Sequence, residues 1–205
     1  SDVCSSDLKN TLEMRPLEGF VFAVSPFNFA SIGGNLPSAP ALMGNVAIWK
    51  PASSAVLPAY YIMRLLEEAG LPKGVINFVP GSGSTIGPII MDHTMLAGVH
   101  FTGSTKVFKG MWSTIGKNID KYLSYPRIVG ETGGKDFCIA HESANIDVLS
   151  TAMVRGAFEY QGQKCSAMSR AYIPSAIWPS LKEIYVDQVK SITMGDPEDF
   201  SHFMN

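Results

Sequence analysis

The chain has 205 residues, of which 46% are hydrophobic, 16 are basic and 18 are acidic, so its formal net charge is −2. This length allows one large domain or parts of two, and the hydrophobic content is that of a chain that buries a core in water. No basic tract is present, which argues against binding to nucleic acid or to an anionic membrane surface.

The three cysteines are Cys4, Cys138 and Cys165, and they form neither a CxxC pair nor a zinc-binding pattern with histidines. We therefore expect a reducing compartment and no metal site. No apolar run reaches the roughly 18 residues that span a bilayer, and no targeting segment is recognised at the start. Residues 1–14 are expected to be a disordered or foreign leader, because the first eight show neither helical nor strand periodicity.

Short apolar runs alternate with longer segments along the chain, which is the rhythm of a βαβ protein. In chain order, the predicted strands are 20–24, 46–49, 75–79, 99–101 and 137–140. Their apolar residues occupy successive positions, as is typical of strands that are buried on both faces. The sequence therefore predicts an α/β fold with a parallel sheet covered by helices.

Four helices are predicted beside these strands. The clearest begins with Ser53 or Ser54 as its N-cap and ends before Gly70. One side of it carries Leu57, Tyr61, Leu65 and Ala69. The other three helices span about 105–118, 148–160 and 177–190. Segment 31–40 contains two glycines and two prolines, so a helix there is expected to start only late, with a proline in its first turn.

Two glycine-rich turns follow predicted strands. The first spans 78–87 and includes Gly81, and the second contains Gly103 and Ser104 at the opening of a helix. Bare backbone amides and the positive end of a helix dipole suit a pyrophosphate. Neither turn has the GxGxxG spacing of a dinucleotide fingerprint, so the spacing alone favours an ordinary tight turn at each site.

Three polar residues stand where chemistry can occur. Lys50 ends a predicted strand, at the edge where open α/β sheets bind ligands, although a solvated lysine before a turn is the alternative. Cys165 lies in a polar turn after a predicted helix, where a thiol can ionise and act as a nucleophile. Glu131 lies between glycines and is either a general base or a surface acid. Cys138, by contrast, is expected to be a small residue of the core.

Five motifs, taken in order, resemble those of the aldehyde dehydrogenase superfamily. They are SPFNF at 25–29, WKP at 49–51, FTGS at 101–104, GETGGK at 130–135 and GQKC at 162–165. The resemblance covers residues 15–205, and the separation of Glu131 from Cys165 also fits the family pattern. Segments 33–36, 39–45, 158–160 and 165–167 are similar to the 1-pyrroline-5-carboxylate dehydrogenase branch, as is Phe108 where most of the superfamily has glycine.

The resemblance implies the Rossmann-like parallel sheet of the aldehyde dehydrogenase fold. Residues 15–132 would form a partial NAD-binding domain, and 133–205 the first part of an α/β catalytic domain. The implied reaction is the NAD-dependent oxidation of L-glutamate γ-semialdehyde to L-glutamate in proline catabolism. Another semialdehyde or fatty aldehyde dehydrogenase, or a non-catalytic nucleotide-binding fragment, remains an alternative.

The resemblance also implies roles for individual residues. Cys165 would be the nucleophile, the side chain of Asn28 would hold the oxyanion, and Glu131 would activate water. The implied cofactor-binding residues are Phe27, Lys50, Ser53, Gly81, Gly103 and Ser104. Because Ser53 replaces a ribose-binding glutamate of many members, the preference between NAD and NADP stays open. The implied substrate-binding residues are Phe29, Lys164 and Ser166, with Lys164 either steering a carboxylate, pairing with an acid outside the chain or simply solvated.

By the same resemblance we expect a mitochondrial matrix enzyme that forms a homodimer or a larger oligomer. The irregular start and the final residues, which follow a turn at 194–197, are typical of a truncated reading frame. The family's later segment with a nicotinamide-ribose-binding glutamate is not among these residues. We therefore expect the 205-residue chain to be inactive alone.

Overall fold

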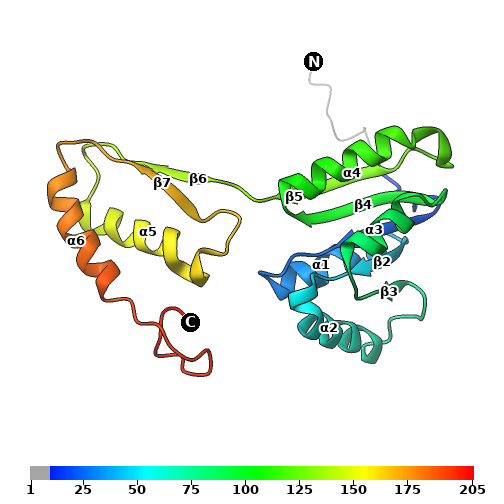
Figure 1. Ribbon diagram of the computed structural model, residues 1–205, viewed down its shortest axis with the longest axis horizontal. Coiled ribbons are helices and arrows are strands. Elements are labelled where there is room, and N and C mark those ends of the chain that lie inside the picture. Colours follow the sequence, from blue (N-terminus) through cyan, green and yellow to red (C-terminus); the bar gives the residue numbers. More distant parts are fainter. Residues whose placement is uncertain (1–9) are drawn as a thin grey trace, which may run out of the picture. The chain divides into compact units, whose positions relative to one another are not determined.

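The computed structural model describes residues 10–205. They form two compact units, of which the first ends at Glu131 and the second spans Thr132–Asn205 (Figure 1). Cys4 lies outside the described residues, and so do residues 1–9 of the expected leader at 1–14. Residues 10–14 are exposed and carry no regular secondary structure.

The first unit alternates strands and helices. Its elements are β1 (Phe20–Val24), α1 (Ala30–Leu42), β2 (Val46–Lys50), α2 (Val56–Glu68), β3 (Ile76–Phe78), α3 (Gly83–Met91), β4 (Leu96–Gly103), α4 (Thr105–Lys117) and β5 (Arg127–Thr132). The strands form one sheet in the order β3-β2-β1-β4-β5, and β1 pairs in parallel with both β2 and β4. The predicted α/β fold with a parallel sheet is confirmed.

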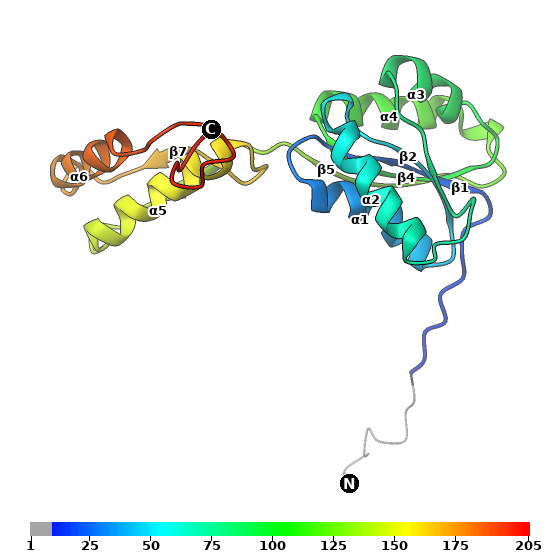
Figure 2. The ribbon, with the colours of Figure 1, turned by 90° about the horizontal axis from the view of Figure 1, so that it is seen from below.

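Helices cover both faces of this sheet, with α1 and α2 on one face and α3 and α4 on the other (Figure 2). Neighbouring residues of β1 therefore enter different cores. Phe22 packs in the core beneath α3 and α4 with Phe101, whereas Ala23 packs beneath α1 and α2 with Trp49. Successive apolar residues of β1 thus contribute to one core or the other. Each Å² of apolar surface that they bury stabilises the fold by about 25 cal/mol.

The helix α1 differs from the sequence-based expectation. It begins at Ala30, well before its prolines, and both Pro37 and Pro40 lie inside it. A proline in a helix interior removes the backbone donor to the carbonyl four residues earlier and commonly breaks the helix. The prediction of a late start was therefore wrong, and the carbonyl that faces Pro40 must find another partner.

A histidine from the sheet provides that partner. Pro40 has no N–H for the carbonyl of Leu36, and this carbonyl lies 2.9 Å from Nδ1 of His100 on β4. The ring nitrogen must be the donor, because a carbonyl oxygen only accepts. The side chain of Ser38 also donates to the carbonyl of Gly34, at 2.8 Å. Bonds from outside the regular ladder thus keep this helix continuous.

Other elements depart from prediction in smaller ways. No helix was predicted at α3, and no strand at β5. The predicted N-cap of α2 is a 3-10 turn at Ser53–Ala55, with no capping bond from a serine. The side of α2 that carries Leu57 and Leu65 is exposed, and its packed side contains Ala59, Ile62, Met63 and Leu66. Because apolar residues occur on both sides of this helix, the sequence alone did not decide which side packs against the sheet.

The second unit contains β6 (Asp136–Ile139), α5 (Ile146–Phe158), β7 (Met168–Tyr172) and α6 (Trp178–Lys190). The two strands are parallel, α5 packs against α6 and β7, and Ser150 donates to the side chain of Gln188 at 2.8 Å. Phe137 and Ile139 of β6 are exposed, and Cys138 is only partly buried. The expectation of full burial is wrong here, because the described residues place two strands in this sheet and leave one face of β6 uncovered.

The bond between His100 and Leu36 predicts a coupling in stability with Pro40. We expect His100→Phe to lower the free energy of unfolding by about 1–3 kcal/mol, because a part-buried carbonyl loses its donor. In a Pro40→Ala background the new N–H can bond to Leu36, so the same change should cost less. Urea unfolding of the two single variants and the double variant measures the coupling, and strictly additive losses would contradict it.

Candidate active site

Three chain segments leave the first sheet at the same edge. In the parallel register Val24 of β1 lies beside Lys50 of β2 and beside Phe101 of β4. The loops that follow these strands carry Asn28 and Ser104, so both emerge at the carboxyl edge with Lys50. The strand order reverses on the two sides of β1, and this switch point is where open α/β sheets bind ligands.

The lysine at this edge is buried. Lys50 is 7% exposed, and its Nζ donates to the carbonyl of Pro51 at 2.8 Å. Burial lowers the pKa of its amine from the usual value. A Cβ placed on Gly83 would lie 3.4 Å from Cε of Lys50, so the lysine adjoins the first turn of α3. Lys50 is therefore a sheltered cation beside a helix N-terminus, and it is not a solvated residue of a turn.

Both glycine-rich turns end in serine caps. The Oγ of Ser82 accepts from the N–H of Ser84 at the start of α3, and the Oγ of Ser104 accepts from the N–H of Val107 at the start of α4, each at 3.3 Å. Gly81 precedes the first cap with φ of +151°, and a Cβ there would lie 2.9 Å from Ile86. The turns are tight because of their glycines, and each opens a helix whose first N–H groups point outward.

Two aromatic rings occupy space that two motif glycines leave. Phe101 stacks on Phe108 with ring centroids 5.6 Å apart. A Cβ on Gly103 would lie 2.7 Å from the ring of Phe101, and a Cβ on Gly130 would lie 2.2 Å from the ring of Phe108. Only glycine fits at either position. The stack thus packs α4 against the strand that carries Glu131, one residue beyond Gly130.

The loop after β1 carries the first motif. Ser25 is buried and its Oγ accepts from the indole N–H of Trp49 at 2.9 Å, which fastens the start of the loop to β2. Phe27 is exposed, whereas Asn28 and Phe29 are partly buried, and Phe29 is the N-cap residue of α1. Asn28 therefore lies in a short, anchored connection between a buried strand and a helix.

An open groove of about 780 Å³ runs between α3 and α4. Its lining is mostly apolar and includes Gly83, Gly87, Pro88, Val107, Gly110 and Met111. Gly83 also adjoins Lys50. One end of the apolar groove, at Gly83, therefore lies next to a buried cation and a helix N-terminus, which is an arrangement that suits a nucleotide with a phosphate and a flat base. Neither α3 nor this groove was predicted from the sequence.

In the second unit, Cys165 lies in a compact double turn. The N–H of Gln163 donates to the carbonyl of Tyr160 at 3.0 Å, and that of Ala167 donates to the carbonyl of Lys164 at 3.1 Å. Cys165 and Ser166 are the central residues of the second turn, which follows α5 in the chain. Cys165 is partly buried, as an accessible nucleophile should be.

An acidic residue ahead of this turn was not found from the sequence. The carboxylate of Glu159 lies 2.5 Å from Arg155 and also pairs with Lys164. Hydrogen bonds from Arg155 and Lys164 lower the pKa of Glu159 from 4.5 to about 2. Lys164, proposed either to steer a substrate or to pair with an acid elsewhere, has an acidic partner within the chain. The spacing of Arg155 and Glu159, one helical turn apart, is the signal that would have identified this acid.

The proposed site residues divide between the two units. Asn28, Glu131 and the cofactor-binding set belong to the first unit, whereas Lys164, Cys165 and Ser166 belong to the second. Within the first unit the register brings Lys50 and Ser104 to one edge, and Gly81 lies in the turn before α3. Ser53 is exposed in its 3-10 turn. Within the second unit, a Cβ on Gly134 would lie 2.8 Å from the carbonyl of Cys165, so Gly134 lies next to the cysteine turn.

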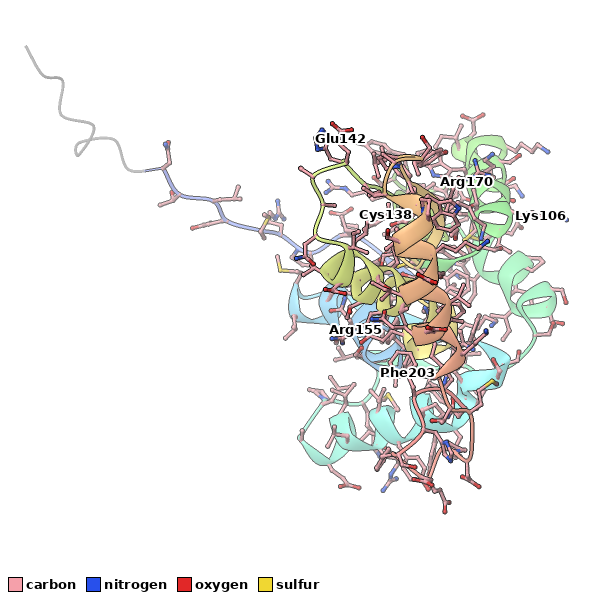
Figure 3. The ribbon with its side chains drawn as sticks, turned by 90° about the vertical axis from the view of Figure 1, so that its left-hand side faces the viewer. Lys106, Cys138, Glu142, Arg155, Arg170 and Phe203 are labelled. Atoms are coloured by element: carbon pink, nitrogen blue, oxygen red, sulfur yellow. The ribbon has the colours of Figure 1, made fainter. Side chains whose placement is uncertain are left out.

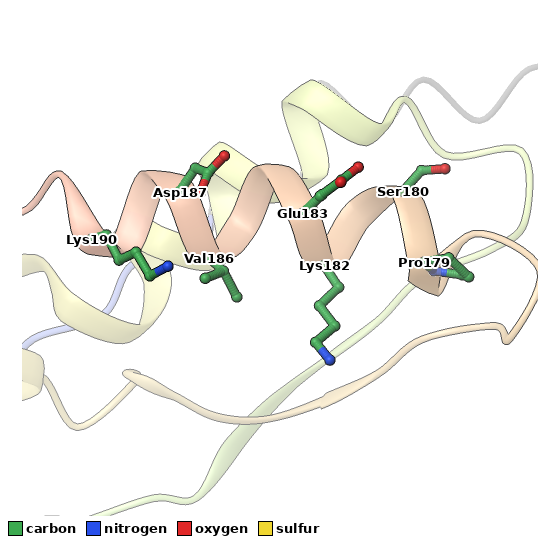
Figure 4. Close-up of a pocket in the computed structure, with 7 residues that line it drawn as sticks. All are labelled: Pro179, Ser180, Lys182, Glu183, Val186, Asp187 and Lys190. Carbon is green, nitrogen blue, oxygen red and sulfur yellow. The ribbon is translucent and has the colours of Figure 1, made fainter.

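A second hollow lies along α6 and has no comparable chemistry. Its residues all come from that one helix, with Lys182 and Lys190 on one side and Glu183 and Asp187 on the other (Figure 4). Side chains from a single helix form a shallow surface. In residues 10–205 we find no cluster of three or more His, Cys, Asp or Glu side chains suited to a metal. None of the helices in that range is long and apolar enough to cross a bilayer.

Comparison with known proteins gives one consistent result. The model of the aldehyde dehydrogenase family matches residues 2–204. The "Delta-1-pyrroline-5-carboxylate dehydrogenase, mitochondrial" of Dictyostelium discoideum is 54% identical over 96% of this chain and 36% of its own length. The protein of the same name from Mus musculus is 49% identical over 93% of this chain and 34% of its own length.

A solved structure is similar as well. The delta-pyrroline-5-carboxylate dehydrogenase of Mycobacterium tuberculosis, in a crystal structure with bound NAD, superposes with a TM-score of 0.90 at 54% identity. The match covers 93% of this chain and 36% of that protein. The chain thus spans about a third of the length of the relatives that it matches.

The low pKa of Glu159 predicts a pH-dependent contribution to stability. A carboxyl with a folded-state pKa below its unfolded value stabilises the fold above the unfolded pKa, and this contribution is lost as the pH falls through the folded pKa. Relative to Glu159→Gln, the wild-type chain should therefore be more stable at pH 6, and the difference should shrink from pH 4.5 toward about 2. Urea midpoints at pH 6 and pH 3 measure this, and an unchanged difference would contradict the pairing.

Proposed function

The chain belongs to the aldehyde dehydrogenase family, and from this premise we propose that it carries the cofactor-binding and nucleophile-bearing part of an NAD-dependent delta-1-pyrroline-5-carboxylate dehydrogenase. Such an enzyme oxidises L-glutamate γ-semialdehyde to L-glutamate. The single observation that carries the proposal is the identity of about half of the residues with dehydrogenases of this name, over more than nine-tenths of the chain. Relatives named mitochondrial support placement in the mitochondrial matrix, and we expect the full-length protein to form a dimer or larger oligomer.

The first unit offers a place that fits NAD. The buried amine of Lys50 beside the first turn of α3 suits the ribose and phosphates of the adenosine half, and the groove between α3 and α4 suits the flat adenine. Phe27, Gly81, Gly103 and Ser104 border the same carboxyl edge or its glycine turns. Exposed Ser53 places no negative charge there, which leaves room for a 2′-phosphate and thus for NADP. When bound, NAD accepts a hydride from the substrate carbon.

Cys165 is proposed as the nucleophile. Its thiolate would attack the aldehyde carbon, forming a carbon–sulfur bond while the carbonyl electrons move to oxygen. The resulting oxyanion would accept hydrogen bonds from the side-chain amide of Asn28 and from the backbone N–H of Cys165. Loss of hydride from this thiohemiacetal leaves a thioester on Cys165.

Glu131 is proposed as the base that completes the reaction. It would take a proton from water as the water oxygen attacks the thioester carbon, and the carbon–sulfur bond then breaks to release the acid and the thiolate. The ring of Phe108 against Gly130 restrains the strand directly before Glu131. For the substrate, the hydroxyl of Ser166 is proposed to donate to the carboxylate of the amino acid, and Phe29 to contact its aliphatic part.

The groove proposal can be tested on the chain itself. Gly110 lines the groove and Gly116 lies outside it on the same helix, and a Cβ at either position meets no atom within 4 Å. Gly110→Leu should weaken NAD binding about tenfold or more by filling the groove, an effect of about 1.4 kcal/mol, whereas Gly116→Leu should leave it unchanged. Both substitutions remove a helix glycine, so their effects on helix propensity match.

Isothermal titration with NAD and with AMP measures both variants. Equal affinity of the two variants for AMP would show that adenine does not bind between α3 and α4. Titration of NADP against the wild-type chain and Ser53→Glu tests the phosphate subsite, since an added carboxylate should repel the 2′-phosphate more than it disturbs NAD.

The reaction is tested in a protein of full family length that contains this sequence. Cys165→Ser should abolish NADH production from glutamate γ-semialdehyde, because a serine hydroxyl lacks the nucleophilicity of a thiolate. Cys138→Ser is the matched control and should retain activity. Asn28→Ala should lower kcat by about 100- to 1,000-fold through loss of one oxyanion donor. A higher kcat/KM for succinic semialdehyde or a fatty aldehyde would redirect the substrate assignment, and an active Cys165→Ser protein would refute the nucleophile.

A further inference from the structure

The turn before Cys165 is strained. Tyr160 and Gln161 have φ of 57° and 54°, and they are the only non-glycine residues with positive φ in the described range 10–205. Gly162 follows with φ of 64° and lies close to the carbonyl of Ala157, where a Cβ would approach to 2.9 Å. Non-glycine residues in this conformation cost about 1–2 kcal/mol each. Other interactions must therefore hold this backbone in place.

One carboxylate spans the strained segment. Glu159 is the residue directly after α5, and Oε1 of its carboxylate receives a hydrogen bond from Arg155 in the last turn of that helix. Oε2 pairs with Lys164, on the other side of the left-handed residues. Arg155 is labelled on α5 in Figure 3. The acid thus ties the rigid helix to the residue next to Cys165.

We propose that Glu159 is a positioning residue for Cys165, which holds the left-handed turn closed and commits the charge of Lys164 to itself rather than to a substrate carboxylate. This inference rests on the proposed role of Cys165 as nucleophile. The depressed pKa of Glu159, about 2, means that the acid stays ionised across the pH range in which a thiol titrates. Lys164, the residue directly before Cys165 in the chain, is thereby paired with an ionised acid.

The charges around Cys165 in the second unit define what each substitution should do. Arg155, Glu159 and Lys164 form the ion-pair network. From β6, the carboxylate of Asp136 adjoins the place that a Cβ on Gly134 would occupy, and the carbonyl of Cys165 borders the same place. Removing Glu159 leaves Lys164 uncompensated, which favours the thiolate, whereas removing Lys164 leaves carboxylates that disfavour it.

The test is the pH dependence of Cys165 alkylation by iodoacetamide in the 205-residue chain, read by peptide mass spectrometry so that Cys138 is scored separately. Glu159→Gln should move the midpoint of the curve to lower pH by about 0.5 unit, and Lys164→Gln should move it to higher pH by a similar amount. Arg155→Gln is the matched control. It removes the other partner of the same carboxylate, and it should leave the midpoint unchanged while it loosens the turn.

A purely structural role for Glu159 would alter the plateau rate at high pH in Glu159→Gln and Arg155→Gln alike, without opposite movements of the midpoint. That result, or a midpoint that moves in the same direction for Glu159→Gln and Lys164→Gln, would overturn the proposal. Alkylation is measured whether or not the protein oxidises an aldehyde. Failure of this inference is therefore distinguishable from failure of the proposed function.

Discussion

The parallel hydrogen-bonded register of β1 with β2 and β4 is the constraint on which the first unit depends. Val24, the last residue of β1, lies beside Lys50, the last residue of β2, and beside Phe101 of β4, which ends only at Gly103. The loops that follow these three strands therefore share one edge of the sheet. From β2 the sheet continues to β3 on one side of β1, and from β4 it continues to β5 on the other side. A reversal of strand order of this kind forms a crevice at the carboxyl ends of the strands beside β1. The glycine turns, the buried lysine and the two capped helices are all consequences of where those strands stop.

Two local backbone preferences are violated in this fold, and in each case a side chain outside the affected residues compensates. Pro40 inside α1 deprives the carbonyl of Leu36, and His100 lies within hydrogen-bonding distance of it. The left-handed residues before Cys165 are spanned by Glu159 and its two cations. Exposed ion pairs are individually weak, but a carboxylate that binds two cations restricts both ends of one short turn. Side chains outside the affected residues, distant in the chain for α1 and adjacent for the cysteine turn, therefore allow backbone conformations that these residues alone disfavour.

The elements best predicted from the sequence are those with one dominant signal. The continuous apolar runs of β1 and β2 gave their positions because burial on both faces admits no other pattern. The helix α4 was predicted because the glycine turn with Ser104 stands at its start. By contrast α1 was misjudged, since the bond from His100 that rescues it comes from a strand about sixty residues away. The burial of Phe137 was misjudged because burial depends on what lies against a strand, which the strand's own residues do not encode.

The same distinction applies to the candidate site. Lys50 and Cys165 could be identified from the sequence because they belong to motifs. The role of Glu159 becomes visible only in the structure, where the turn brings Lys164 to its carboxylate. Gly103 and Gly130 are instructive in the other direction. Gly103 was a candidate for backbone approach to a ligand and Gly130 only a flanking residue of Glu131, yet both lie where the stacked rings of Phe101 and Phe108 leave no space for a Cβ. A glycine in a functional motif can thus be required by an aromatic side chain of the protein itself, and substitution there would disturb the strand of Glu131 through packing before any ligand is bound.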